Sequence, residues 1–500
     1  MKRRDFLRWT GVGATLAAAG ACGTSGTPGA TKEPARPGGW TDSPARHRLR
    51  IRPQLAVGAA PAELSLRTGS TEFVAGRTTP TWGVNGTYLG PTLRMTRGEP
   101  AALRVRNGLP ETTSLHWHGL HLPARMDGGP HQPITAGGVW EPRWEVGNAA
   151  STAWYHPHPH GQTASHVFRG VAGLIVVDDP GDVAASQLPR DYGVDDIPVI
   201  LQDRTIDANG QVVWDAVPTF GQMGERMLVN GTLDAFVDVT TRRVRLRLLN
   251  ASNARLYNVC FADGRRFTLV AADQGVLPAP VDLTRLALGP AERAEIVVEC
   301  APGERVVMGT ASGPETIDEG DFALLELRAA ASLRDSPAVP ADLGGAGPLA
   351  PPAQARTRTF RLQGHDAIND RGMDMTRIDE VVPAGAVEIW ELENNVYSHN
   401  FHIHGVDFSI LDRDGRPPHA WETGRKDTVH VPEKSRVRLA VRFPQFTDPS
   451  SPYMYHCHIL RHEDAGMMGQ FVVVEPGTES SVSHTLDTRG GAHAAHSGRH

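Results

Sequence analysis

Apolar and polar residues alternate in many short stretches of this chain. The segments "ALRVRNGL", "RVRLRLLNAS" and "AVEIWELENN" show this most plainly, and each predicts a half-buried strand that runs into a turn. Helical periodicity is scarce, and 53 Gly and 38 Pro supply frequent turns between strands. The pattern therefore predicts an all-β protein built from β-sandwiches or barrels.

The same pattern occurs three times at nearly equal spacing. The three segments reach Asn107, Asn250 and Asn394, which are 143 and 144 residues apart. Such a period predicts one fold unit repeated three times, with an Ala/Pro/Gly-rich linker before the third. We expect a leader and linker over 1–45, three domains over 46–180, 190–330 and 355–478, and a flexible tail over 479–500.

The net charge gives no support for nucleic acid as a partner. The chain has 500 residues and a net charge of -6, so its electrostatics give no reason to expect nucleic-acid binding. We expect small-molecule partners. The sequence does not indicate an oligomeric state.

The first residues are typical of an export signal. Arg3 and Arg4 precede a modest apolar run over 12–21, which is too short to cross a bilayer as a helix. "MKRRDFLRW" resembles a twin-arginine signal, so we expect the protein in the periplasm, attached to the cell envelope or outside the cell. Cys22 follows "AAAGA", which resembles a lipoprotein processing site, and lipid anchoring there stays an open alternative.

Histidines recur in closely spaced pairs. With 22 histidines in this chain, random placement gives roughly one His-x-His pair, whereas five occur if the overlapping pair is counted. On a strand, both imidazoles of a pair lie on one face, and four pairs supply eight nitrogens, enough for a copper cluster with room for oxygen. In "HPHPH" only two of His156, His158 and His160 are needed, and the choice stays open.

The pairs lie in the first and third domains. "LHWHGL" and "WYHPHPHG" belong to the first, and "HNFHIHGV" and "MYHCHIL" belong to the third. After Asn250 the second domain reads "NARLYNVCF", and later it offers only "AEIVVEC", with no histidine in either segment. We predict that the second domain is a spacer and that the metal site lies between the first and third.

A cysteine stands in the middle of the last pair. The stretch "MYHCHILRHEDAGMM" has a single cysteine, whereas zinc sites favour repeated Cys or His pairs. Cys457, His462 and Met467 are the ligand types of a blue-copper electron-transfer site, and His399 is a candidate for its second histidine. Neighbours on a strand face opposite sides, so the two histidines that flank Cys457 would face a different metal.

These motifs together resemble those of multicopper oxidases. "HWHG", "WYHPHPHG", "HNFHIHG" and "HCHILRHEDAGMM" are similar to that family's four copper motifs, and "VNGTYLGPTLRMTRGE" and "GRKDTVHVP" are similar to its supporting frame. The likeness covers about residues 46–478 and is greatest to the three-domain bacterial branch, which includes copper efflux oxidases and bacterial laccases. It implies three cupredoxin-like domains.

The resemblance implies four copper ions and a role for each motif residue. A type 1 copper that collects electrons would be held by His399, Cys457, His462 and Met467, with Met468 as an alternative to Met467. The type 2 copper would be held by His116 and His402. The type 3 pair would be held by His118, His156, His158, His404, His456 and His458, with His160 outside the ligand set.

The resemblance also implies an activity. Such a protein oxidises phenolic or aromatic donors, or cuprous ion, and passes four electrons to dioxygen to make water. Reduction consumes protons, and Asp127 and Glu463 match the family's acidic residues near the cluster, where carboxylates can carry protons. The long methionine-rich insertion of many efflux oxidases is missing from this sequence, and Met373, Asp374 and Met375 are either a cuprous-ion site or turn and core residues.

Several alternatives stay open. Cys260 and Cys300 form a disulfide or are two buried free thiols. The histidines of the tail bind metal weakly or belong to a disordered segment. A copper-sequestering or structural protein is the non-enzymatic alternative, although such relatives would be expected to lose ligands. A copper nitrite reductase is disfavoured, because it needs a single catalytic copper.

Overall fold

The computed structural model describes residues 45–215 and 220–486, and it is built mostly from strands. Two short α-helices occur among these residues, α1 (Thr163–Arg169) and α2 (Leu460–Asp464), so the all-β prediction is confirmed. No helix in the described ranges has both the length and the apolar character needed to cross a membrane. The predicted export signal and Cys22 lie outside the described residues.

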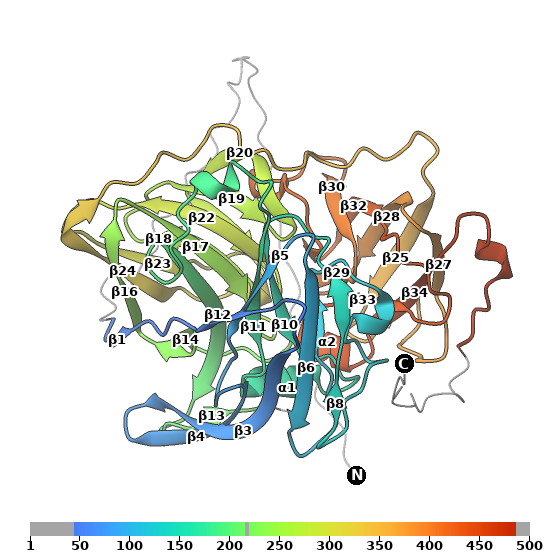
Figure 1. The fold of residues 1–500 in the computed structure, drawn as a ribbon, viewed down its shortest axis with the longest axis horizontal. Helices are drawn as coiled ribbons and strands as arrows, with labels where there is room; N and C mark the ends of the chain where they lie inside the picture. Colours follow the sequence, from blue (N-terminus) through green and yellow to red (C-terminus); the bar gives the residue numbers. More distant parts are fainter. Residues whose placement is uncertain (1–44, 216–219, 487–500) are drawn as a thin grey trace, which may run out of the picture. The chain divides into compact units, whose positions relative to one another are not determined.

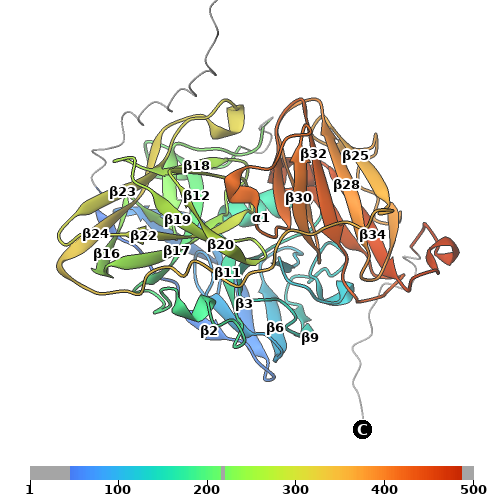
Figure 2. The same ribbon diagram turned by 90° about the horizontal axis from the view of Figure 1, so that it is seen from above.

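The described strands form six sheets, which follow one another along the chain as three pairs (Figures 1 and 2). The first pair is blue to teal, the second green to yellow, and the third orange to red. Short 3-10 helices occur in the connections: η1 (Ala124–Met126), η2 (Ala185–Gln187), η3 (Thr316–Asp318), η4 (Ala420–Glu422) and η5 (Glu479–Ser481).

The first pair of sheets encloses a core rich in aromatic side chains, including Trp117, Trp144 and Tyr155. One sheet contains β4 (Arg77–Val84), β3 (Ala62–Val74), β6 (Pro100–Gly108) and β8 (Val139–Trp140), with β9 (Arg143–Glu145) also beside β6. The other contains β2 (Gln54–Ala56), β5 (Thr92–Thr96), β11 (Gly173–Asp178), β10 (Ser151–His156) and β7 (His116–His118).

The second pair encloses an apolar core that includes Leu246, Phe261 and Phe267. One sheet contains β15 (Thr232–Leu233), β14 (Arg226–Val229), β12 (Asp196–Ile206), β17 (Arg243–Asn250), β22 (Arg293–Glu299), β19 (Phe267–Ala272) and β20 (Gly275–Leu283), with β13 (Val212–Val213) beside β12. The other contains β1 (His47–Arg48), β16 (Ala235–Thr241), β24 (Phe322–Arg334), β23 (Arg305–Thr310), β18 (Tyr257–Phe261) and β21 (Arg285–Leu288).

The third pair packs around Phe360, Trp390 and Tyr455. One sheet contains β26 (Ala367–Ile368), β25 (Thr357–Gln363), β28 (Val387–Asn394), β32 (Ser435–Arg442) and β30 (Asp407–Arg413). The other contains β27 (Glu380–Pro383), β34 (Met468–Val474), β33 (Tyr453–Cys457), β29 (His399–Ile403) and β31 (Thr428–Val431).

The three repeated asparagines make the same kind of side-chain hydrogen bonds in each pair of sheets. Strands β6, β17 and β28 each have a parallel neighbour, which is β3, β12 and β25 respectively. The side-chain oxygens of Asn107, Asn250 and Asn394 each accept the backbone N–H two residues further on, and their amides donate to backbone carbonyls of nearby loops. This is an Asx turn, which ends the strand and fixes the loop that follows.

The strand order corrects one comparison between the repeats. The later histidine segments belong to β10 and β33, and the second pair has β23 at the equivalent place, between β18 and β24. The segment "AEIVVEC" belongs to β22, which pairs with β17. Position along the chain does not show which strands pair, so the predicted equivalence of "AEIVVEC" with the later histidine segments is wrong. Strand β23 reads "RVVMGT" and also has no histidine or cysteine.

The structure departs from the predicted domain boundaries in three places. β1 joins the second pair of sheets beside β16, although it lies in the segment assigned to the first domain. β24 continues to Arg334, beyond the boundary predicted at 330. Residues 479–486 of the predicted tail are ordered against the third pair, because Val482 and Leu486 pack beside Ile378 and backbone bonds join the two segments.

The two remaining cysteines are buried free thiols. Cys260 is 7% exposed and Cys300 is 3% exposed, and neither forms a disulfide. Burial raises the pKa of both thiols, and it raises that of Cys300 to about 11. Of the two alternatives left open by the sequence, the structure has the free thiols.

Candidate metal centre

Four strands from two different pairs of sheets, together with the residues just after three of them, bring eight histidines together. β7 and β10 belong to the first pair and place His116 opposite His156. β29 and β33 belong to the third pair and place His402 opposite His456. Each of the eight side chains is at most 1% exposed: His116, His118, His156, His158, His402, His404, His456 and His458.

Six of these rings form two triads. In one, His156 Nε2 lies 3.4 Å from His118 Nδ1 and 3.4 Å from His458 Nε2. In the other, His456 Nε2 lies 3.1 Å from the Nε2 atoms of both His158 and His404. Two histidine nitrogens that share an ion at about 2.0 Å are roughly 3.3 Å apart at a tetrahedral angle. Each triad therefore has the spacing of ligands around one ion, and each mixes residues from both pairs of sheets.

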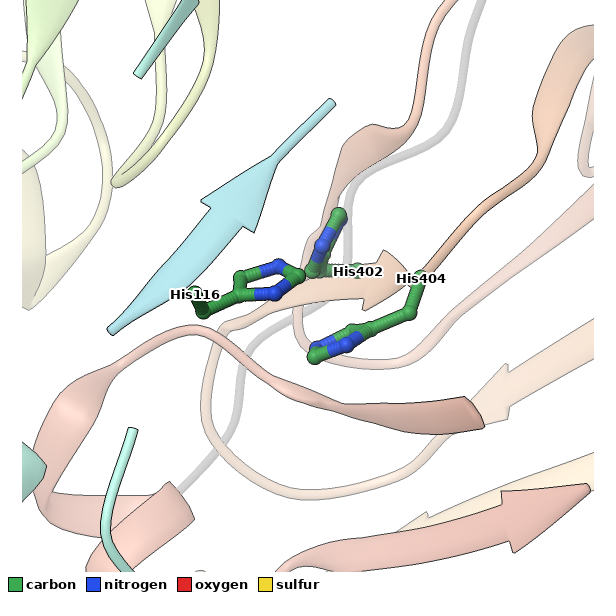
Figure 3. Close-up of side chains that lie close together, drawn as sticks. All are labelled: His116, His402 and His404. Carbon is green, nitrogen blue, oxygen red and sulfur yellow. The ribbon is translucent and has the colours of Figure 1, made fainter. Parts of the chain in front are cut away.

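The last two rings present unused nitrogens. The Nδ1 of His116 donates to the Asp127 carbonyl at 2.9 Å, and the Nδ1 of His402 donates to the Asp427 carbonyl at 2.8 Å. The Nε2 atoms of both rings are buried and have no hydrogen-bond partner. A buried polar atom without a partner is costly, so these two nitrogens are suited to a bound cation. Figure 3 shows His116 beside His402 and His404, and ligand atoms of these three residues lie within 4.8 Å of one another.

Burial keeps the imidazoles in the form that binds metal. It lowers the pKa of His118, His156, His158, His404, His456 and His458 well below the usual value, and the neighbouring rings lower it further. The rings are therefore neutral, and each has one nitrogen lone pair for a ligand.

Asp127 fixes the orientation of two histidines. Its Oδ2 accepts the Nδ1–H of His404 at 2.6 Å, and its backbone carbonyl holds His116. The next residue, Gly128, has a φ of +80°, and a Cβ there would lie 1.8 Å from the Leu115 carbonyl oxygen. Only glycine fits this position, so the turn that presents Asp127 depends on it.

Glu463 lies on the other side of the cluster. Its two carboxylate oxygens are 3.4 Å from His158 Nδ1 and 3.3 Å from His456 Nδ1, and both are buried without a hydrogen-bond partner. Burial, reinforced by Asp464, raises the pKa of Glu463 well above its usual range. A carboxyl group in this environment can hold a proton beside the cluster at neutral pH.

Asp427 is a site residue that could not be recognised from the sequence, although it lies in the segment "GRKDTVHVP". Its Oδ1 accepts from His118 Nε2 at 3.1 Å, which leaves His118 Nδ1 facing His156. Burial opposes the charged form of Asp427, but its ion pair with Arg293 holds its pKa well below the usual value. A lone acid inside a frame motif gives no signal of this role, because its partners are distant in the sequence.

A second cluster surrounds Cys457. Its Sγ lies 3.5 Å from the Nδ1 atoms of His399 and His462, and all three side chains are buried. Burial raises the pKa of the Cys457 thiol to about 12, so a bound cation is needed to keep the thiolate. Met467 packs in the same apolar cluster as Cys457, whereas Met468 begins β34 and pairs with His456. This packing favours Met467 as the fourth ligand.

The two clusters are connected through the backbone of β33. His456 and His458 flank Cys457 in the chain, and they belong to the two different triads. The flanking side chains point away from that of Cys457, as alternation on a strand requires.

The structure also separates the three alternating histidines, since His156 and His158 are buried in the triads and His160 is exposed. The sequence left this choice open.

Comparisons with known proteins identify similar chains. A family model described as multicopper oxidase matches residues 66–182, and a second one with the same description matches residues 348–477. A cell division protein FtsP of Sodalis glossinidius is 37% identical over 425 residues, which are 83% of this chain and 89% of that protein. The multicopper oxidase mco of Staphylococcus aureus is 33% identical over 82% of this chain and 88% of that protein.

Solved structures show the same similarity. The laccase-like multicopper oxidase CueO of Ochrobactrum sp., with oxidase activity towards lignin model compounds, has a TM-score of 0.78 at 38% identity over 85% of this chain and all of that one. A multicopper oxidase of Campylobacter jejuni, described as a metallo-oxidase, has a TM-score of 0.74 at 27% identity. That match covers 86% of this chain and 96% of the other.

The alternating histidines provide a matched test of the triads. Replacing His158 with Gln removes one ligand nitrogen, so we expect the purified protein to bind fewer copper ions per chain. His160→Gln is the control, because His160 is exposed two residues away. Copper content measured by elemental analysis should fall for His158→Gln only. A full copper complement in His158→Gln would contradict the assignment of the second triad.

Proposed function

The chain belongs to the multicopper oxidase family, and we propose that it couples one-electron oxidation of phenolic or aromatic donors, or of cuprous ion, to reduction of dioxygen to water. The family makes it a copper oxidoreductase with cupredoxin-like, all-β architecture. The donor is the part that we propose, with laccase-like oxidation as the first candidate.

The observation that carries the proposal is the completeness of the two clusters. The residues that would hold the type 1 copper are His399, Cys457 and His462, with Met467 beside them. The two triads would hold the type 3 pair, and the unused Nε2 atoms of His116 and His402 would hold the type 2 copper. Bound copper would supply one-electron redox chemistry at Cys457 and oxygen reduction at the histidine cluster.

The protein's own contribution is to join and shield these clusters. The short covalent path from Cys457 to His456 and His458 links the place where a donor is oxidised to the place where oxygen is reduced. Both clusters are buried, so the ligands are protected from water. We propose that Asp127 and Glu463 move protons toward bound oxygen, since each carboxylate lies beside ligand histidines and has an oxygen without a hydrogen-bond partner.

The alternative is a copper-sequestering or structural protein. The similarity to proteins named for cell division gives a specific reason to test it. Every motif position that the family resemblance assigns to copper is filled in this chain, and these side chains converge in two buried clusters. A protein that no longer needed catalysis would not need both clusters, which favours the oxidase.

One loop bears on cuprous ion as a donor. The backbone N–H of Met373 donates to the Gly466 carbonyl at 2.9 Å, and Gly466 immediately precedes Met467. Met373 and Met375 are half-buried, while Asp374 is exposed. Thioether sulfur favours cuprous ion, so this loop is a candidate entry point for it beside the type 1 ligands.

We further propose that the protein is exported. The supporting observation is the sequence of the leader, with Arg3 and Arg4 ahead of an apolar run. The protein would then work in the periplasm, on the cell envelope or outside the cell, and Cys22 is the candidate site of a lipid anchor.

Cys457 tests the proposed activity most simply. Cys457→Ser removes the thiolate, so we expect loss of the visible blue colour and of donor-dependent oxygen consumption. Cys300→Ser is the matched control, because it makes the same change at a buried free cysteine outside the clusters. Retention of both properties in copper-loaded Cys457→Ser would show that this cysteine is not the electron-accepting ligand.

Asp127 tests the proposed proton supply. Asp127→Asn keeps the size of the side chain but cannot carry a proton in the same way, and we expect oxygen reduction to slow by about 100-fold. In the absence of oxygen, a donor should reduce the type 1 site of the variant at the wild-type rate. The two steps are separated by stopped-flow absorbance, and an unchanged oxygen reaction at normal copper content would exclude Asp127 from proton delivery.

The methionine loop tests the choice of donor. Replacing Met373 and Met375 with Leu keeps apolar volume but removes both sulfur atoms, so KM for cuprous ion should rise while KM for a simple phenol stays the same. Met308→Leu, in the buried core of the second pair, controls for a general loss of stability. Equal effects on both donors, or none on cuprous ion, would remove the loop from substrate binding.

A further inference from the structure

The second pair of sheets carries no copper-ligand motif, yet one of its arginines reaches the histidine cluster. Arg293 begins β22 and its side chain is completely buried. Two of its guanidinium nitrogens bond the carboxylate of Asp427, with an Nη1 to Oδ1 distance of 2.7 Å. Asp427 in turn contacts ligand histidines, so the two residues form a bridge from the second pair to the cluster.

The guanidinium is held in a fixed orientation. Besides its two bonds to Asp427, Nε donates to the Thr152 carbonyl, Nη1 to the Ala291 carbonyl and Nη2 to the Asp273 carbonyl, each at 3.1 Å. All five N–H donors of Arg293 therefore have acceptors. These acceptors come from all three pairs of sheets or their connections, so Arg293 fixes Asp427 relative to the whole site.

Asp427 passes this orientation to two ligands. Its Oδ1 accepts from His118 Nε2 at 3.1 Å, and its backbone carbonyl accepts from His402 Nδ1 at 2.8 Å. The first bond leaves His118 Nδ1 for the triad, and the second leaves His402 Nε2 free of protein partners. The N–H of each ring thus points to Asp427, and the lone pair points to the cluster.

Gln274 and Thr428 complete the environment of the carboxylate. Gln274, also from the second pair, donates through Nε2 to Asp427 Oδ2 at 2.6 Å. Thr428 Oγ1 donates to Asp427 Oδ1 at 2.7 Å and lies 3.1 Å from His402 Nδ1. The carboxylate has little freedom to rotate while these bonds and the Arg293 pair are in place.

We propose that Arg293 is a positioning residue for the trinuclear copper site and acts through Asp427 on His118 and His402. The proposal rests on the proposed oxidase function, because it assumes that these histidines hold copper. Lysine cannot replace arginine here, since an ammonium is a point charge with three donors and cannot make two parallel bonds to a carboxylate and reach three carbonyls. Partners of metal-ligating histidines typically alter metal affinity by about 10- to 100-fold when they are changed.

Arg293→Lys tests this proposal by copper binding rather than by turnover. We expect the copper-loaded variant to keep its blue type 1 absorption. Its type 2 electron paramagnetic resonance signal should change, and a chelator should remove trinuclear copper at about 10- to 100-fold lower concentration than from the wild type. Arg358→Lys is the matched control, because Arg358 is also buried and bonds Glu388 through two nitrogens, and its other bonds go to Glu380 and the Val381 carbonyl instead of Asp427.

The possible outcomes distinguish a failure of the positioning role of Arg293 from a failure of the proposed oxidase function. A wild-type type 2 signal and wild-type chelator resistance in Arg293→Lys would overturn the positioning role and leave the oxidase intact. Wild-type protein that binds no trinuclear copper would overturn both. If Arg293→Lys does not fold, Asp427→Asn takes its place, and a normal type 2 signal in Asp427→Asn would equally overturn the proposal.

Discussion

The structure depends on burying eight imidazoles where water cannot reach them. Each ring needs an acceptor for its N–H, and its second nitrogen must share a cation with its neighbours, because a buried lone polar atom is costly. Backbone carbonyls serve His116 and His402, and carboxylates serve His118 and His404. The surrounding fold supplies these acceptors at fixed positions, and the ligand geometry follows from them.

That requirement explains why the site lies between two repeated units. Two neighbouring strands in a single unit, with the residues just after them, supply only four histidines, so residues of two units must come together to assemble two triads. The triads mix residues from both, which means that neither pair of sheets holds a complete site alone. The second pair, predicted as a spacer, has no ligand histidines in its equivalent described strands, but it contributes the arginine that holds Asp427. Its function is therefore structural support at the site and not only separation.

The features that depend on a local pattern of residues could be predicted from the sequence. Alternation predicted the strands that reach Asn107, Asn250 and Asn394. The histidine pairs, and the cysteine between two histidines, predicted two kinds of metal cluster. The division of six histidines into triads was not predictable, because it depends on which strands of different units meet. The choice against His160 needed the end of β10, after which the chain turns to the surface. Asp427 was missed because its partner Arg293 is 134 positions away.

The most direct test of the central claim is the number of one-electron donors oxidised per dioxygen consumed by the fully copper-loaded protein. A phenol and cuprous ion would each be measured with an oxygen electrode and a parallel assay for hydrogen peroxide. Two clusters that cooperate as described predict four donors per dioxygen and no peroxide with at least one of these donors. A ratio of two with peroxide as product, or no oxygen uptake with either donor, would contradict the account.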